Sequence, residues 1–174
     1  FQGVHHFDGH VYKKHGPETK CVINSEGSKL VENIHEVLVK CGIKDGMTLG
    51  FHHHFREGDY VVNMVMREIH AMGIKDITIC ASSLGKAHDP LVEYIEDGTI
   101  TNIQSSGVRG KIGEAISNGK LKGLAIMRSH GGRVRALVTG ETQIDIAFIG
   151  TPTCDEYGNC RGIGLSLIHI SEPT

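Results

Sequence analysis

Short apolar runs alternate along this chain with stretches of helical periodicity, and this alternation restricts the possible folds more than any other feature. The runs predicted to be strands are 47–49, 77–80, 99–104, 124–127 and 144–149. Helical spacing of apolar residues marks 28–42, 59–73, 89–98 and 112–119, and 134–138 fits a helical turn or a strand. Strands separated by helices at roughly 20–30 residues favour parallel pairing and right-handed crossovers. The sequence therefore predicts an α/β fold with an open, mainly parallel sheet and helices on both faces.

Polar residues predict where three of the helices begin. Ser28 and Asp59 each precede a helical apolar pattern, as N-capping residues do. Asp89 is followed by Pro90, a residue that is favoured at the first position of a helix. We therefore expect Asp89 to cap the helix that follows it.

The segments that follow the predicted strands are rich in Gly, Ser, His and Arg, whereas opposite turns such as 44–46 are ordinary charged turns. These strand-following loops are 52–56, 82–83, 105–110, 129–133 and 155–158. Open α/β sheets bind ligands beyond the carboxyl ends of their strands. Glycine lets backbone N–H groups approach an anion, and Arg offers a fork to a carboxylate or phosphate. We expect the loops to converge on one pocket for an anion; the alternative is that short turns simply favour Gly and Ser.

Three consecutive histidines, His52 to His54, leave three interpretations open. Adjacent loop residues point in different directions and rarely ligate one zinc ion, so contact with an anionic substrate or loop packing is favoured over metal binding. His130, between Ser129 and Gly131, is a further candidate for contact with a ligand. Ser106 could hold an anion or cap the following helix.

Composition excludes several classes of protein. The 174 residues suffice for one domain, and a net charge of −2 does not fit a basic nucleic-acid-binding protein. No apolar run approaches the roughly 20 residues of a membrane span, and the first residues lack a signal-peptide core. Five cysteines without a Cys-x-x-Cys pair indicate a reducing, cytoplasmic location.

The two ends differ from the middle of the chain. We expect 1–20 to be a loose N-terminal arm and 21–162 to be the α/β domain. The last segment, 163–174, is interpreted as an adapter-derived tail, because 165–174 resembles the translation of a transposase adapter used for DNA sequencing libraries. On this interpretation the chain is a truncated fragment.

The residues alone do not name a reaction. The sequence contains no Gly-x-Ser-x-Gly elbow, no Walker loop and no Ser–His–Asp order. The residues alone predict an anion-binding α/β domain, without indicating which reaction it performs.

Several longer motifs resemble the alpha-subunit family of bacterial citrate lyases. These are 45–48, 51–59, 62–66, 81–84, 101–110, 129–134 and 152–159, in register from about Cys21 to Gly162. The resemblance implies a coenzyme-A-transferase-like fold, of which this chain holds the first of two α/β domains. It also implies transfer of an acyl-carrier-protein thioester from acetyl to citrate, which gives citryl-carrier and acetate. The expected partners are the beta subunit, which cleaves citryl-carrier to oxaloacetate, and the gamma subunit, the acyl carrier.

The resemblance also directs the assignment of the site. No cofactor is expected on this chain itself, because the acyl group travels on the dephospho-CoA-derived prosthetic group of the carrier. We expect no metal either. Glu156 is not assigned as a nucleophile, since the family is thought to pass the acyl group through a mixed anhydride. His130 and Arg109 are the catalytic candidates. The substrate-binding candidates are His52, His53, Arg56, Ser82, Ser83, Ser106, Gly107, Gly110, Gly131, Gly132 and Arg133.

Two other classes of protein are alternatives: a non-catalytic or sugar-phosphate-binding domain and, less favoured, a metal-binding protein that uses the His cluster. The same fold serves non-catalytic modules and sugar-phosphate-binding domains, and fold alone does not choose among them. Because the family's site lies between two domains, we also expect negligible turnover from this fragment alone.

Overall fold

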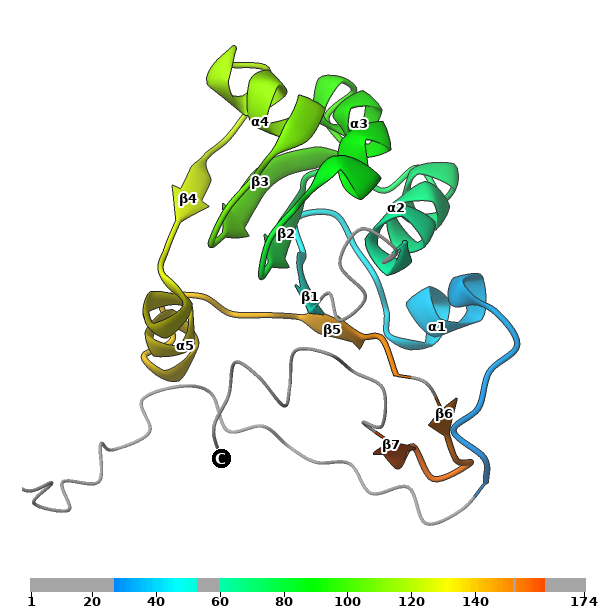
Figure 1. Cartoon of the computed structure of the whole chain (residues 1–174). Coiled ribbons are helices and arrows are strands. Elements are labelled where there is room, and N and C mark those ends of the chain that lie inside the picture. The colour runs from blue at the N-terminus through cyan, green and yellow to red at the C-terminus, as the bar shows by residue number, and fades with distance from the viewer. Residues whose placement is uncertain (1–26, 53–59, 152, 162–174) are drawn as a thin grey trace, which may run out of the picture.

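The computed structural model describes residues 27–52, 60–151 and 153–161, and its centre is a sheet of five parallel strands (Figure 1). The order across the sheet is β4-β3-β2-β1-β5. The strands are β1 (Thr48–His52), β2 (Ile77–Ala81), β3 (Ile100–Ser105), β4 (Ala125–Met127) and β5 (Ile146–Ile149). The predicted α/β fold with a parallel sheet is confirmed.

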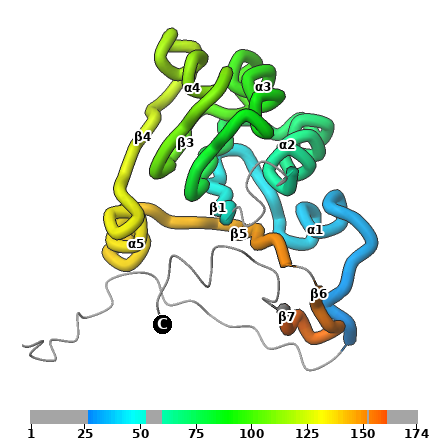
Figure 2. The backbone as a smooth tube through the Cα atoms, in the orientation of Figure 1, coloured from blue at the N-terminus to red at the C-terminus, as the bar shows by residue number. Residues whose placement is uncertain are grey.

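Helices connect consecutive strands, as the alternation predicts. The connecting helices are α2 (Val61–Ala71), the 3₁₀ helix η2 (Lys86–Leu91), α3 (Val92–Glu96), α4 (Gly110–Ser117) and α5 (His130–Val138), and one further helix, α1 (Ile34–Lys40), precedes β1. The chain steps outward from β1 to β4 and then returns through α5 to β5, on the other side of β1 (Figure 2). Ligands in open α/β sheets bind where the strand order reverses in this way, which here is between β1 and β5.

The first four α-helices and η2 cover one face of the sheet and enclose the core. Leu49, Ile79 and Ile103 from neighbouring strands are at most 1% exposed, and Leu38 of α1 and Ile69 of α2 are fully buried against the same cluster. Burial of each such side chain contributes about 1.5–3 kcal/mol. This packing holds the strands, and therefore the loops at their carboxyl ends, in fixed register.

The opposite face is covered by α5 and the segment that follows it. Arg133 reaches Cys80 of β2, and Thr142 reaches Gln104 of β3. Ile144 lies over Gly50 of β1, so closely that an added Cβ at Gly50 would be 2.9 Å from two of its carbon atoms. Figure 1 shows α5 apart from the other helices, beside β4 and β5. The prediction of helices on both faces is correct.

Three local predictions differ from the structure. The first helix begins at Ile34, because Asn33 rather than Ser28 accepts the backbone N–H of Glu36 at 2.9 Å. The predicted loop 129–133 is mostly the first turn of α5, because the hydroxyl of Ser129 caps a helix there. The predicted loop 155–158 is the turn of a small antiparallel hairpin, β6 (Thr153–Cys154) with β7 (Cys160–Arg161).

Asp89 caps a different helix from the one expected. It lies within η2, and its Oδ1 accepts the backbone N–H of Lys111 in α4 at 2.8 Å. Asp89 therefore caps a helix that it reaches through tertiary packing, and not the helix that the Asp-Pro pair predicts.

The predicted arm 1–20, the tail 163–174 and the capping residue Asp59 lie outside the described residues. In the part of the chain that the structure describes, no helix is long and apolar enough to cross a membrane.

Candidate functional site

Two of the strand-following loops are joined by backbone hydrogen bonds at the carboxyl edge of the sheet. Leu84 donates to the carbonyl of Gly107 at 3.0 Å, and Arg109 donates to the carbonyl of Leu84 at 2.9 Å. Ser106 donates to the carbonyl of Ser82 at 3.2 Å. The structure therefore brings together predicted site residues that lie more than twenty positions apart in the sequence.

The loop that carries Arg109 is held by Asp89. Gly110 has a positive φ of 67°, and an added Cβ would collide with Asp89 Oδ1, so glycine is required there for two reasons. Arg109 itself is exposed, and it forms no ion pair within 27–52, 60–151 and 153–161. Its charge is available to a ligand.

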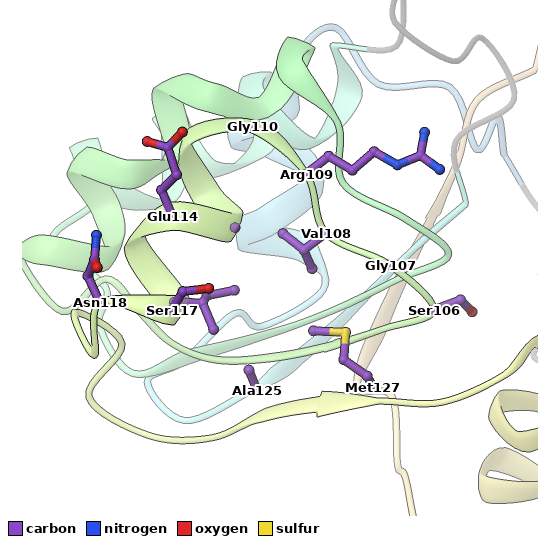
Figure 3. Close-up of a pocket in the computed structure, with 12 residues that line it drawn as sticks. Ser106, Gly107, Val108, Arg109, Gly110, Glu114, Ser117, Asn118, Ala125 and Met127 are labelled. Carbon is purple, nitrogen blue, oxygen red and sulfur yellow. The ribbon is translucent and has the colours of Figure 1, made fainter.

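A hollow of about 830 Å³ lies between α4 and β4 (Figure 3). Of the predicted site residues it includes Ser106, Gly107, Arg109 and Gly110, with Met127 on the side of β4. Figure 3 shows the Arg109 side chain extending away from the hollow, and the Ser106 hydroxyl turned away from Met127. The Arg109 guanidinium and the Ser106 hydroxyl therefore do not face the hollow.

A second group of predicted site residues lies on the sheet face that α5 covers. Gly50, Cys80 and Gln104 are register partners on this face, and strand alternation places His52, Ser82 and Ser106 two residues further along, at the carboxyl edge. These three predicted site residues therefore share the sheet face that α5 covers.

Arg133 and Ser106 each bring a buried polar atom to this region. Arg133 Nη2 lies 3.9 Å from Cys80 Sγ, and no carboxylate of the described residues pairs with this guanidinium. Its Nε and the Oγ of Ser106 are buried without a hydrogen-bond partner in the described part of the chain. Buried polar groups are rarely left unsatisfied, so these two atoms mark a place where a polar ligand is expected.

The first turn of α5 contributes differently from what the sequence predicts. The Gly132 N–H donates to Ser129 Oγ at 3.1 Å and is therefore occupied, whereas no side chain or backbone atom crowds Gly131. His130 is exposed in the same turn. Gly107 likewise uses its N–H, toward Ser105 Oγ at 3.2 Å.

Gln104 and Arg128 were not predicted, although they hold α5 in place. Gln104 Oε1 accepts from Arg128 Nη1 at 2.9 Å and from Thr142 Oγ1 at 2.7 Å. Arg128 precedes α5 and Thr142 follows it, so one amide anchors both ends of the helix. The available signal was a Gln near the end of a predicted strand.

The turn of the β6–β7 hairpin is organised by an acid. Hydrogen bonds from the side chain and backbone of Asn159 lower the pKa of Asp155, and those from Tyr157 and Gly158 act in the same direction. Glu156 is exposed, and its carbonyl accepts the backbone N–H of Lys29 at 2.7 Å. This carboxylate is not directed at the α5 face by any contact in the described residues.

Of the remaining predicted residues, His53 and Arg56 lie outside the described residues, and Ser83 is half-buried beside Ser82. Convergence of all five loops on one pocket stays a prediction. Among the described residues no three His, Cys, Asp or Glu side chains are grouped as metal ligands would be.

Comparisons with known proteins identify related chains. The family model described as citrate lyase, alpha subunit (CitF), matches residues 27–167. The citrate lyase alpha chain of Haemophilus influenzae is 45% identical over 158 residues, which are 91% of this chain and 32% of that protein. The Escherichia coli alpha chain is 50% identical over 134 residues, 77% of this chain and 26% of that protein.

A solved structure is also similar. It is the alpha subunit of citrate lyase from Streptococcus mutans, determined in complex with citrate, with a TM-score of 0.81 and 51% sequence identity. The similarity covers 91% of this chain and 31% of that one. The chain thus spans about a third or less of the length of the relatives that it matches.

Proposed function

This chain belongs to the family of citrate lyase alpha subunits, and from that premise we propose that the protein containing it transfers an acyl-carrier-protein thioester from acetyl to citrate. The products are citryl-carrier and acetate. The carrier, a gamma subunit, supplies the thioester on its prosthetic group, and a beta subunit cleaves the citryl group to oxaloacetate. We place the complex in the cytoplasm, in keeping with free thiols at all four cysteines of the described residues.

The observation that carries this proposal is the citrate-bound relative of 51% identity, together with the guanidinium of Arg133, which pairs with no carboxylate of the described residues. Citrate is a polycarboxylate, and guanidinium–carboxylate contacts are strong because both partners are charged. Ser106 Oγ provides a second buried polar group for the same ligand.

The remaining candidates have roles that follow from their chemistry. A citrate carboxylate that attacks the thioester carbonyl develops negative charge on the carbonyl oxygen, which preorganised N–H donors stabilise by roughly 3–4 kcal/mol each. We assign this role to the first turn of α5, where the Gly131 N–H is a better candidate than the Gly132 N–H that Ser129 occupies. Arg109 and His130, both exposed at the edge, are assigned to the charged groups of citrate and the departing acetate.

The chain spans about a third of its relatives, so the activity belongs to the longer protein. We expect the 174 residues to bind citrate weakly and to show negligible turnover. Measurable citrate-dependent acetyl transfer by this chain alone would contradict that expectation.

The test is a titration of the chain with citrate, followed by NMR. Arg133→Gln should weaken binding by roughly 10- to 100-fold, because a charge-assisted hydrogen bond contributes about 1.5–3 kcal/mol. Arg135→Gln is the matched control, since Arg135 lies on the same helix, is 73% exposed and pairs with Glu141. Equal affinity in the two variants would refute the assignment of Arg133.

A second titration distinguishes the proposed transferase from the alternative, a sugar-phosphate-binding module. If ribose 5-phosphate binds and citrate does not, the chain is a sugar-phosphate-binding module. Binding of citrate alone supports the transferase.

A further inference from the structure

Two cysteines face each other across the small hairpin that follows β5. Cys154 of β6 and Cys160 of β7 are direct register partners in this antiparallel pair. Both are exposed and both are free thiols. Sequence reasoning, which looks for a Cys-x-x-Cys pair, does not single out this spacing.

The hydrogen bonds of the hairpin decide what kind of pair this is. Asp155 donates its backbone N–H to the carbonyl of Asn159 at 3.0 Å, so Asp155 and Asn159 form a hydrogen-bonded pair. Hydrogen-bonded and non-hydrogen-bonded pairs alternate along antiparallel strands. Cys154 and Cys160 therefore occupy a non-hydrogen-bonded position, where Cα atoms are roughly 4.5 Å apart and side chains are close. That separation lies within the range that a disulfide spans.

The turn holds this geometry before any bond forms. Asp155 Oδ1 accepts the backbone N–H groups of Tyr157 at 3.0 Å and Asn159 at 2.8 Å, and Oδ2 accepts Asn159 Nδ2 at 2.8 Å. Gly158, at a φ of 82°, donates to the carbonyl of Asp155 at 3.0 Å. This is the arrangement of a tight hairpin turn with glycine in the left-handed region.

We propose that Cys154 and Cys160 form a reversible redox site, a dithiol that a small-molecule disulfide such as glutathione disulfide converts to an intramolecular disulfide. One cysteine thiolate attacks glutathione disulfide, forms a mixed disulfide and releases one glutathione thiolate. The second cysteine thiolate then attacks the protein sulfur and releases the other glutathione. Two protein thiols are oxidised, one glutathione disulfide is reduced to two glutathiones, and the two protons that the protein thiols lose are taken up, through solvent, by the two released glutathione thiolates.

The site fits the environment indicated by the cysteines. In a reducing compartment the pair stays a dithiol, and disulfides that form there are characteristically transient and redox-sensing. Closure would lock the turn that bears Glu156, whose carbonyl binds the segment before α1 through Lys29. The inference does not depend on the proposed transferase function.

The test uses the 174-residue chain equilibrated in glutathione buffers of increasing oxidised fraction, with remaining thiols blocked by N-ethylmaleimide. Trypsin leaves both cysteines on one peptide, 136–161, since no Lys or Arg lies between Arg135 and Arg161. We expect this peptide to become two hydrogens lighter, and cleavage after Tyr157 to leave its halves linked. Exposed Cys41 is the internal control and should instead take up a single glutathione.

Variants make the result decisive. Cys154→Ser and Cys160→Ser should each leave a glutathione adduct on the remaining cysteine. Asp155→Ala should require at least about threefold more glutathione disulfide for half-oxidation, because the turn no longer holds the thiols together. The proposal is overturned if peptide 136–161 carries two glutathiones, stays reduced when Cys41 is modified, or oxidises equally in concentrated urea.

Discussion

Asp89 provides the sharpest test of how the site loop is held, because it acts on a helix that is not its own. Its Oδ1 accepts the N–H of Lys111 at 2.8 Å, within the first turn of α4, where Arg109 at the N-cap offers no side-chain bond. Asp89→Ala removes both a capping hydrogen bond and a negative charge at a helix N-terminus. Asp89→Asn removes only the charge, because the amide oxygen still accepts.

The expected costs follow from these two contributions. A lost cap costs about 1 kcal/mol and a lost N-terminal charge about 0.3–1 kcal/mol. Asp89→Ala should therefore lower the free energy of unfolding by about 1.5–2 kcal/mol, and Asp89→Asn by about 0.5–1 kcal/mol. For a chain of this size the alanine variant should melt about 4–6 °C lower.

Gly110 allows a double-mutant test of the same contact. Gly110→Ala places a methyl group in a left-handed backbone and against Asp89 Oδ1. The backbone term alone costs about 1–2 kcal/mol. The substitution should therefore cost less in the Asp89→Ala background than in the wild type, by at least about 0.5 kcal/mol.

Urea unfolding followed by circular dichroism measures the stability of the wild type, the three single variants and the double variant. Glu114→Ala, at an exposed acid on the same helix, is the control and should change stability by less than about 0.5 kcal/mol. Equal stabilities of Asp89→Ala and the wild type, or additive effects with Gly110→Ala, would refute the assigned cap.

Two further predictions concern other parts of the fold. Burial raises the pKa of Asp97, but hydrogen bonds from Lys75 and Thr99 and the charge of Lys75 outweigh it and lower the pKa to about 2. Because the folded-state pKa is depressed, this stabilisation is present above the unfolded value near 4 and is lost as the pH falls toward 2. Asp97→Asn should thus cost about 1–2 kcal/mol at neutral pH, and denaturation at a series of pH values should show the difference vanish in acid. Gly50→Val should destabilise by about 1–3 kcal/mol through collision with Ile144, and Ile144→Ala should restore part of that loss in thermal melts; full additivity would contradict the contact.

Much of the fold could be predicted because strands and helices leave local periodic patterns. Ile77 to Cys80 lies within β2, and the apolar spacing of Val65 and Ile69 marks the buried face of α2. Predictions that rest on a single residue were less reliable. Ser28 looks like an N-cap, but Asn33 has the acceptor at the position where the helix begins.

The position of the strand-following loops was predictable, and their contacts were less so. Loop composition and strand direction indicated the carboxyl edge, where the structure joins Ser82 with Ser106. Gln104 was missed because its role depends on Arg128 and Thr142, which lie 24 and 38 residues away.

The sequence by itself determined the alternation of strands and helices, the parallel sheet and the family, since periodicity and motifs are properties of neighbouring residues. Only the tertiary structure decided which residues far apart in the sequence come into contact. Asp89 caps α4 over 22 residues, Arg133 reaches Cys80 over 53, and Cys154 faces Cys160 because a turn sets their register. Such pairs depend on how helices and strands pack in space, and the spacing of neighbouring residues in the sequence does not determine that packing.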